Sequence, residues 1–154
     1  MQKNLDPGNV TAKQKIISFS GGLVVLVDEI LKNLSFKYLP DESQASGKGI
    51  FELAIHKNYG IAFDLPLWLP VVICLTIVII IGLIFLTEQN WKKHPWEATG
   101  SILIICGAIG NLIDRFFYGF TVDYIIFPLT RSAFNLSDII IISGLLIMIL
   151  NRKK

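Results

Sequence analysis

Residues 68–86 form an apolar stretch without one charged side chain, and no other feature restricts the possible folds as much. A helix of this length can cross roughly 30 Å of hydrocarbon, whereas a soluble domain seldom accommodates so long an uncharged segment. Hydrophobic residues make up 53% of the chain before glycine is counted, and charged residues make up 17%. The sequence therefore predicts an integral membrane protein.

Three further apolar stretches complete a predicted all-α membrane protein, a four-transmembrane-helix bundle in a single polytopic domain, 1–154. The predicted spans are about residues 16–34, 68–86, 98–118 and 134–150, with an extracytoplasmic segment at about 35–66. The first span could be mistaken for a signal sequence, because Lys13 and Lys15 precede its apolar core. Asp28 and Glu29 at its far end do not resemble a cleavage site, so we interpret it as a helix that stays in the protein.

Basic residues gather at the flanks that four spans would place on one side of the membrane. By the positive-inside rule this side is cytoplasmic, and both termini lie there. The loop between the first two spans is slightly acidic, which suits the outer side. The basic flanking residues are Lys3, Lys13, Lys15, Lys92, Lys93, Arg152, Lys153 and Lys154.

The long outer loop carries the pattern of a small sheet. In residues 51–56 apolar and other side chains alternate, which is the period of a strand, and the turn signal Asn-Tyr-Gly follows at 58–60. We expect Gly47 and Gly49 to mark the turn before this strand, and residues 36–39 to supply its partner. The predicted sheet thus lies between the first and second helices.

Polar side chains cluster at one predicted depth, near the outer ends of the spans. Ionisable groups within a span cost several kcal/mol unless they pair or face water, so by default they indicate function. Helical spacing places Asp28 and Lys32 on one face, and it does the same for residues 111, 114 and 115. The clustered residues are Asp28, Glu29, Lys32, Asn111, Asp114, Arg115, Asp123, Asn135 and Asp138.

The residues available restrict the chemistry of such a site. The two histidines, His56 and His94, belong to no serine-protease or zinc motif, and Cys74 and Cys106 lack metal-ligand spacing. A net charge of +2 gives no indication of nucleic acid. We therefore expect no metal and no cofactor. Two aspartates that share one proton could hydrolyse a peptide bond, one as the base for water and one as the acid.

Four motifs follow one another along the chain. Residues 58–63 read Asn-Tyr-Gly-Ile-Ala-Phe, 110–115 Gly-Asn-Leu-Ile-Asp-Arg, 122–124 Val-Asp-Tyr, and 134–138 Phe-Asn-Leu-Ser-Asp. Together they resemble the motifs of the bacterial lipoprotein signal peptidases, also called signal peptidase II. The chain departs from the family pattern by Ile61 for alanine, Tyr124 for phenylalanine, Ser137 for alanine and Glu29 for glutamine.

The resemblance implies an aspartic endopeptidase of the bacterial inner membrane whose active site faces the extracytoplasmic side. Its substrates would be lipid-modified prolipoproteins, cut just before the diacylglyceryl-cysteine, and membrane lipids would surround it. It would act as a monomer and bind peptide antibiotics such as globomycin at its dyad. The implied dyad is Asp123 and Asp138, and the implied supporting or substrate-binding residues are Asn58, Gly60, Asn111, Asp114, Arg115, Asn135, Asp28 and Lys32.

Other interpretations remain open from the residues alone. Asp138 could simply cap the fourth helix, and Asp28–Lys32 and Asp114–Arg115 could be structural ion pairs. Buried carboxylates also suit a proton-coupled transporter, but that function favours polar residues at mid-membrane depth and symmetry between halves, and we find no repeat. A non-catalytic scaffold would give no reason for carboxylates grouped at one depth.

Overall fold

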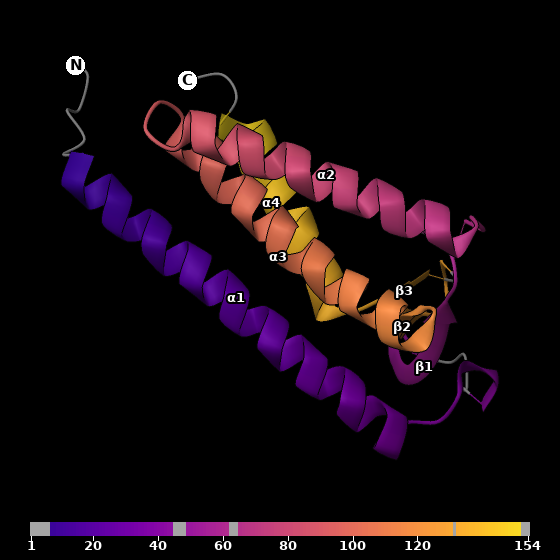
Figure 1. The fold of residues 1–154 in the computed structure, drawn as a ribbon. Helices are drawn as coiled ribbons and strands as arrows, with labels where there is room; N and C mark the ends of the chain where they lie inside the picture. Colours follow the sequence, from indigo (N-terminus) through magenta and orange to yellow (C-terminus); the bar gives the residue numbers. More distant parts are fainter. Residues whose placement is uncertain (1–6, 45–48, 62–64, 131, 152–154) are drawn as a thin grey trace.

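The structure, a computed structural model, describes residues 7–44, 49–61, 65–130 and 132–151. In this part of the chain four helices accompany one short 3-10 helix and a three-stranded sheet (Figure 1). The elements are α1 (Pro7–Tyr38), η1 (Glu42–Gln44), β1 (Glu52–Asn58), α2 (Leu69–Asn90), α3 (Pro95–Tyr118), β2 (Thr121–Phe127), β3 (Ser132–Phe134) and α4 (Leu136–Asn151).

All four predicted spans are helical, but the prediction that each crosses a membrane is not confirmed. By length and composition only α2 and α3, among the described helices, are long and apolar enough. The apolar α4 has 16 residues, which corresponds to about 24 Å. The long α1 carries several charged side chains along its length.

Helix α2 gives the clearest sign of a lipid environment. Its most apolar window has a mean hydropathy of 3.2, yet only 6% of that window is buried inside the protein. Exposing so large an apolar face to water would be energetically unfavourable, whereas contact with hydrocarbon is not. Pro70 stands at its start, where the missing N–H costs nothing.

Helix α3 is the central element and contacts each of the other three helices. Glycines allow it to approach α4 closely: a Cβ on Gly144 would lie 2.5 Å from the carbonyl oxygen of Gly100. Small residues at such crossings are typical of helix packing in membranes. At its end, Gly119 adopts a φ of 80°, a left-handed conformation that glycine reaches without strain.

The sheet is assembled differently from our prediction. Its order is β1-β2-β3, with both pairs antiparallel, so two of the three strands come from the segment between α3 and α4. Residues 36–38, predicted as part of a strand, are instead the last turn of α1. The sheet prediction for 35–66 was therefore right about β1 and wrong about its partner. The true partner lies far along the chain, and local pattern carries no information about such a pairing.

Strand β1 also departs from simple alternation. Its pairing with β2 is irregular between Leu53 and His56, so Ala54 and Ile55 are both buried while Leu53 is 53% exposed. A bulge of this kind re-aims the side chains that follow it. The predicted turn at Gly49 falls in a bend, whereas Gly47 lies outside the described residues.

The sheet covers one end of the helix bundle. In Figure 1 it meets the C-terminal ends of α1 and α3 and the N-terminal ends of α2 and α4. The first turn of α1 and the last turn of α4 lie at the opposite end. The sheet end is where the polar residues meet.

Candidate active site

The structure gathers all of the polar residues singled out from the sequence at the sheet end of the bundle. They come from α1, the end of β1 and the turn after it, α3, β2 and the start of α4. These residues are Asp28, Lys32, Asn58, Gly60, Asn111, Asp114, Arg115, Asp123, Asn135 and Asp138.

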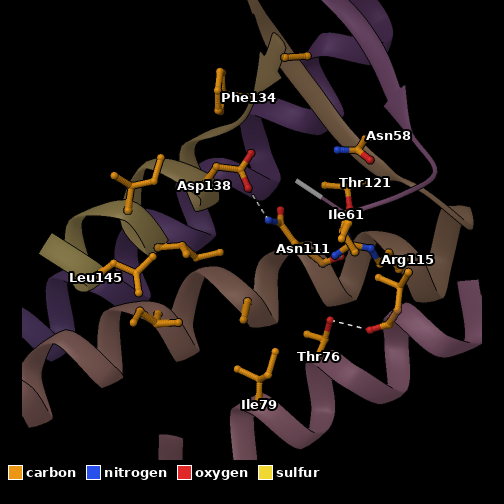
Figure 2. Close-up of a pocket in the computed structure, with 16 residues that line it drawn as sticks. Asn58, Ile61, Thr76, Ile79, Asn111, Arg115, Thr121, Phe134, Asp138 and Leu145 are labelled. Carbon is orange, nitrogen blue, oxygen red and sulfur yellow. Dashed lines mark hydrogen bonds between the residues drawn. The ribbon is translucent and has the colours of Figure 1, made fainter. Parts of the chain in front are cut away.

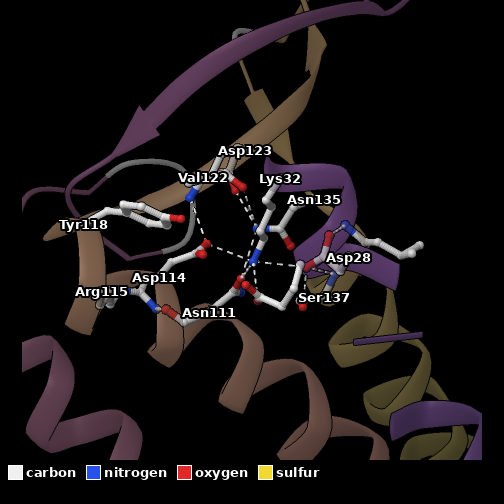
Figure 3. A network of polar contacts seen from close by, with 12 residues as sticks. Asp28, Lys32, Asn111, Asp114, Arg115, Tyr118, Val122, Asp123, Asn135 and Ser137 are labelled. Carbon is white, nitrogen blue, oxygen red and sulfur yellow. Dashed lines mark hydrogen bonds and ion pairs between the residues drawn. The ribbon is translucent and has the colours of Figure 1, made fainter. Parts of the chain in front are cut away.

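One part of this network is an ion cluster around Lys32 (Figure 3). Its ammonium lies 3.0 Å from Asp28 Oδ2 and 2.8 Å from Asp114 Oδ2, and all three side chains are at most 1% exposed. The predicted Asp28–Lys32 pair is therefore present. Asp114 pairs with this lysine across two helices, and not with its neighbour Arg115 as the sequence suggested. The cluster binds α1 to α3.

Asp28 is the most extensively bonded carboxylate of the network. Besides Lys32 it accepts hydrogen bonds from Tyr124 Oη at 2.8 Å and from Ser137 Oγ at 2.6 Å. The backbone N–H groups of Leu136 and Ser137 donate to it at 3.1 and 3.2 Å. These bonds join α1 to both β2 and the first turn of α4.

Our sequence analysis missed Tyr124 and Ser137 as members of the site. The available signal was that both are departures from the family pattern, and that each replaces an apolar residue by one with a hydroxyl group. Both added hydroxyl groups bind the same carboxylate. Burial, and next the hydrogen bond to Asp28, raise the pKa of Tyr124 above its ordinary value, so its hydroxyl remains a donor.

Asp114 also positions the strand that carries Asp123. Its Oδ2 atom accepts the backbone N–H of Val122 at 3.0 Å, one residue before Asp123. The last part of α3 thereby fixes the start of β2. Asp114 acts here as an orienting group.

Asp123 and Asp138 meet around one buried side chain, that of Asn135. The Asn135 amide donates to Asp123 Oδ1 at 2.7 Å, and the Asn135 backbone N–H donates to Asp138 Oδ2 at 3.1 Å. One residue thus contacts both carboxylates, and the charge of Asp138 acts electrostatically on Asp123. The two aspartates come from separate segments, as the sequence predicted.

Asn111 connects the ion cluster to this pair. Its Oδ1 accepts from Lys32 at 3.4 Å and from the Asn135 amide at 3.0 Å. A lysine ammonium only donates, so the carbonyl end of the Asn111 amide must face it. The Asn111 Nδ2 group therefore points to Asp138 Oδ1, 2.8 Å away.

The turn after β1 closes the site from the sheet side. Asn58 Nδ2 donates to Asp123 Oδ2 at 3.1 Å, and Asn58 Oδ1 accepts the Gly60 N–H at 3.0 Å. Arg115 holds this turn through a 3.1 Å hydrogen bond to the Gly60 carbonyl. Asn58 thus has its side chain fixed toward Asp123.

Asp138 also caps α4, as one of the open interpretations suggested. Asn135 stands just before the helix, and its Oδ1 accepts the Asp138 N–H at 2.9 Å while Asp138 accepts the Asn135 N–H. This reciprocal arrangement is a capping box. The side chain of Asp138 therefore both caps α4 and shares the donor residue Asn135 with Asp123.

The electrostatics keep a proton available at this pair. Burial first, and the nearby charge of Asp138 second, raise the pKa of Asp123 from its ordinary 3.8 to about 8. Hydrogen bonds from Asn58 and Asn135 oppose the rise without cancelling it. Asp123 thus carries a proton at neutral pH.

A pocket of about 430 Å³ has Asp138 in its lining, whereas Asp123 is buried and is not one of the lining residues (Figure 2). Its polar end contains Asp138, Asn58, Asn111 and Arg115, and its walls are apolar side chains of the helices. Among the described residues no group of His, Cys, Asp and Glu is arranged to hold a metal ion. The wall residues include Val72, Ile79, Ile104, Ile141, Ile142 and Leu145.

Comparison with known proteins identifies the family of this chain. The family model described as signal peptidase (SPase) II matches residues 21–152. A lipoprotein signal peptidase of Syntrophomonas wolfei subsp. wolfei is 38% identical over 135 residues, or 83% of this chain and 87% of that protein. One from Brucella ovis is 34% identical over 138 residues, or 83% and 86% of the two chains.

Two solved structures of bacterial membrane enzymes, both determined by the in meso method, share the fold. The 2.3 Å structure has a TM-score of 0.72 at 23% identity and covers 93% of this chain and 92% of that one. The 1.9 Å structure has a TM-score of 0.74 at 22% identity and covers 93% and 94%. The family model matches residues 21–152 and both relatives cover 83% of the chain, so this chain belongs to the signal peptidase II family.

Proposed function

We propose that this membrane protein removes the signal peptide from lipid-modified prolipoproteins as an aspartic endopeptidase, with Asp123 and Asp138 as its catalytic pair. The observation that carries the proposal is that both carboxylates accept hydrogen bonds from Asn135, and that Asp138 lies at the polar end of an apolar pocket. The relatives named lipoprotein signal peptidase support the substrate class.

The hydrolysis needs one proton on the pair, and Asp123 carries it. Ionised Asp138, which lines the pocket, removes a proton from a water molecule, and the water oxygen attacks the substrate carbonyl carbon. Asp123 gives its proton to the carbonyl oxygen. In the second step Asp138 passes its proton to the leaving nitrogen as the C–N bond breaks, and Asp123 recovers a proton from the collapsing diol.

The remaining residues hold this pair in position. Asn111 and Asn135 orient the two carboxylates, and Asn58 with Gly60 closes the site beside the substrate. Asp28, Lys32 and Asp114 stabilise the meeting point of α1, α3 and β2. Arg115 holds the turn at Gly60 and interacts electrostatically with both members of the pair.

The apolar walls of the pocket suit acyl chains, so the lipid on the substrate cysteine would lie between the helices. The cut then falls just before that cysteine. The same pocket is where we expect peptide antibiotics such as globomycin to bind. Because one chain supplies every residue of the site, we propose a monomer.

We further propose that all four helices cross the bacterial inner membrane, with both termini cytoplasmic. The uncharged residues 69–86 of α2 are long enough to cross the hydrocarbon core, and the loop that carries Lys92 and Lys93 lies at the end of the bundle opposite the sheet (Figure 1). The site then faces the extracytoplasmic side, where a translocated substrate arrives. Reporter fusions at the loop of residues 91–94 and at both termini test this topology.

Asp123→Asn and Asp138→Asn test the catalytic assignment. Asparagine retains a side-chain oxygen, so Asp138→Asn keeps an acceptor for the helix cap while the acid–base function is lost. Cleavage of a diacylglyceryl-modified prolipoprotein should fall by about 10²- to 10⁴-fold or more. Asp41→Asn, at an exposed aspartate next to η1, is the matched control and should cleave normally.

Normal cleavage by either dyad variant, in a protein that inserts normally, would contradict the catalytic assignment.

Two further measurements test the substrate specificity and the absence of a catalytic metal. A prolipoprotein without the lipid should be cut poorly, and equal cutting would contradict the proposed specificity. A chelator should leave activity intact, whereas loss that added metal restores would indicate a metalloenzyme.

A further inference from the structure

Thr121 carries a hydroxyl group that the fold does not use. Three buried side-chain oxygens in the described residues lack a hydrogen-bond partner: Glu29 Oε1, Asp114 Oδ1 and Thr121 Oγ1. The first two belong to carboxylates that also face Lys32. Thr121 is the one hydroxyl among them, and its residue is only 2% exposed.

Other buried hydroxyl groups in the described part of the chain do find partners. Thr99 Oγ1 donates to the Pro95 carbonyl at 2.8 Å, and Ser137 Oγ donates to Asp28 at 2.6 Å. A buried polar group without a partner destabilises a protein, whereas an apolar group of the same shape does not. Valine at position 121 would fit the strand without that cost, so the hydroxyl is not explained by folding.

The position of Thr121 relates it to the catalytic pair. It precedes Asp123 by two residues on β2, so both side chains lie on the same face of the strand, about 6–7 Å apart along it. Thr121 pairs with Asn58 across the sheet, and Asn58 reaches diagonally to Asp123. Both Thr121 and Asn58 line the pocket (Figure 2).

An extended peptide advances by about 3.3 Å per residue. The distance between Thr121 and Asp123 along β2 therefore corresponds to one or two residues of an extended substrate in the pocket. Rotation about the Cα–Cβ bond of threonine exchanges its hydroxyl and methyl groups, and more than one of these staggered positions is accessible. The hydroxyl can thus turn from its sheltered position toward the pocket that the side chain already lines.

We propose that Thr121 is a substrate-binding residue whose hydroxyl donates to a backbone carbonyl one or two residues from the cleaved bond. The inference rests on the proposed function, because it needs a peptide bound across Asp123 and Asp138. It assigns to Thr121 a partner that the protein itself does not supply. The contact fixes the substrate relative to the pair without taking part in proton transfer.

The test compares Thr121→Val with Thr121→Ser in the full-length protein, using a synthetic lipopeptide that contains a diacylglyceryl-cysteine. Loss of one neutral hydrogen bond should lower kcat/KM about 3- to 10-fold in the valine variant. The serine variant keeps the hydroxyl and should retain most of the activity. The melting temperature of Thr121→Val should equal or exceed that of the original protein.

Thr99→Val is the matched control, because it removes a buried hydroxyl from a residue that does not line the pocket. It should leave kcat/KM unchanged. A Thr121→Val protein that cleaves normally, or one that loses activity only in proportion to a lowered melting temperature, would overturn the proposal. If Asp123→Asn is inactive at the same time, the aspartic mechanism stands and only the role of Thr121 fails.

A second lipopeptide separates the peptide from the lipid as the source of the carbonyl. Its two chains are joined to the glycerol by ether bonds, so it has no ester carbonyl. The effect of Thr121→Val should be the same on this substrate. Disappearance of the effect would assign the contact to the lipid and overturn the proposed peptide contact.

Discussion

Two pairs of aspartates lie at the same end of this protein, and they differ in what stands between them. Asp28 and Asp114 share the ammonium of Lys32, at 3.0 and 2.8 Å. Asp123 and Asp138 share the amide and backbone N–H of Asn135. A nearby cation favours the ionised form of a carboxylate. Around Asp123, burial and the charge of Asp138 outweigh the hydrogen bonds from neutral amides and raise the pKa to about 8. The two pairs therefore differ in whether a cation or a neutral residue joins their carboxylates.

The surroundings reinforce this difference. The Lys32 cluster is sealed between helices, and the hydroxyl groups of Tyr124 and Ser137 further fix Asp28. The Asn135 pair borders the pocket, where Asp138 is only partly buried. The first pair is suited to holding segments together and the second to reacting with a substrate. The replacements Asp123→Asn and Asp138→Asn test through activity whether the second pair is catalytic. The following variants test the structural role of the Lys32 cluster and the protonation of Asp123.

Lys32→Met should have the largest effect on stability. It leaves Asp28 and Asp114 buried without a cation, and breaking a buried ion pair in this way costs about 3–5 kcal/mol. Denaturant unfolding of the detergent-solubilised protein measures the loss. Lys37→Met, at an exposed lysine near the end of the same helix, should change little.

A combined variant then sharpens the comparison. Lys32→Met with Asp114→Asn removes one of the uncompensated charges and should recover part of the lost stability. Equal stability of the Lys32→Met and Lys37→Met proteins would show that the cluster does not hold α1 to α3.

The pH dependence of activity should report the proton on Asp123. The pKa of Asp123 is raised to about 8, so its protonated form persists through neutral pH and is lost as the pH rises past that value. We expect kcat/KM to fall about tenfold per pH unit on the alkaline side. A rate profile measured between pH 5 and 10 tests this, and a flat profile up to pH 10 would contradict it.

Asn58→Ala should move this alkaline limit upward. Asn58 donates to Asp123 and thereby favours its ionised form, so its removal raises the pKa further. The measurement is the position of the alkaline limb rather than the overall rate, which falls in any case because a site residue is lost. An unmoved or lowered limb would mean that Asn58 does not act on Asp123.

Tyr124→Phe should have the smallest effect of this series. It removes one of several donors to Asp28 and restores the residue of the family pattern, so we expect a loss of about 1 kcal/mol in stability. Activity should remain close to that of the unchanged protein, because Tyr124 binds the Lys32 cluster and not the pocket. A large loss of activity with unchanged stability would place Tyr124 in the reaction instead.

Several properties of this protein were determined by its sequence alone. Unbroken apolar stretches predicted the membrane environment and four helices, because hydropathy and length are local properties. Helical spacing placed Asp28 with Lys32, since residues four apart share a face in any α-helix. Motif order identified the family and singled out Asp123 and Asp138, which the structure brings together around Asn135.

Only the tertiary structure decided which distant groups meet. An ion pair of Asp114 with Arg115 was one open interpretation, but Asp114 binds Lys32 of another helix, and β1 pairs with β2 rather than with residues 36–39. Tyr124 and Ser137 were visible only as departures from a motif until the fold placed both against Asp28. The local sequence determines where helices form and which surfaces are apolar, because both properties depend on residues close together in the chain and on the surrounding lipid. Strand partners and buried ion pairs depend on how segments far apart in the chain pack together, which no local pattern specifies.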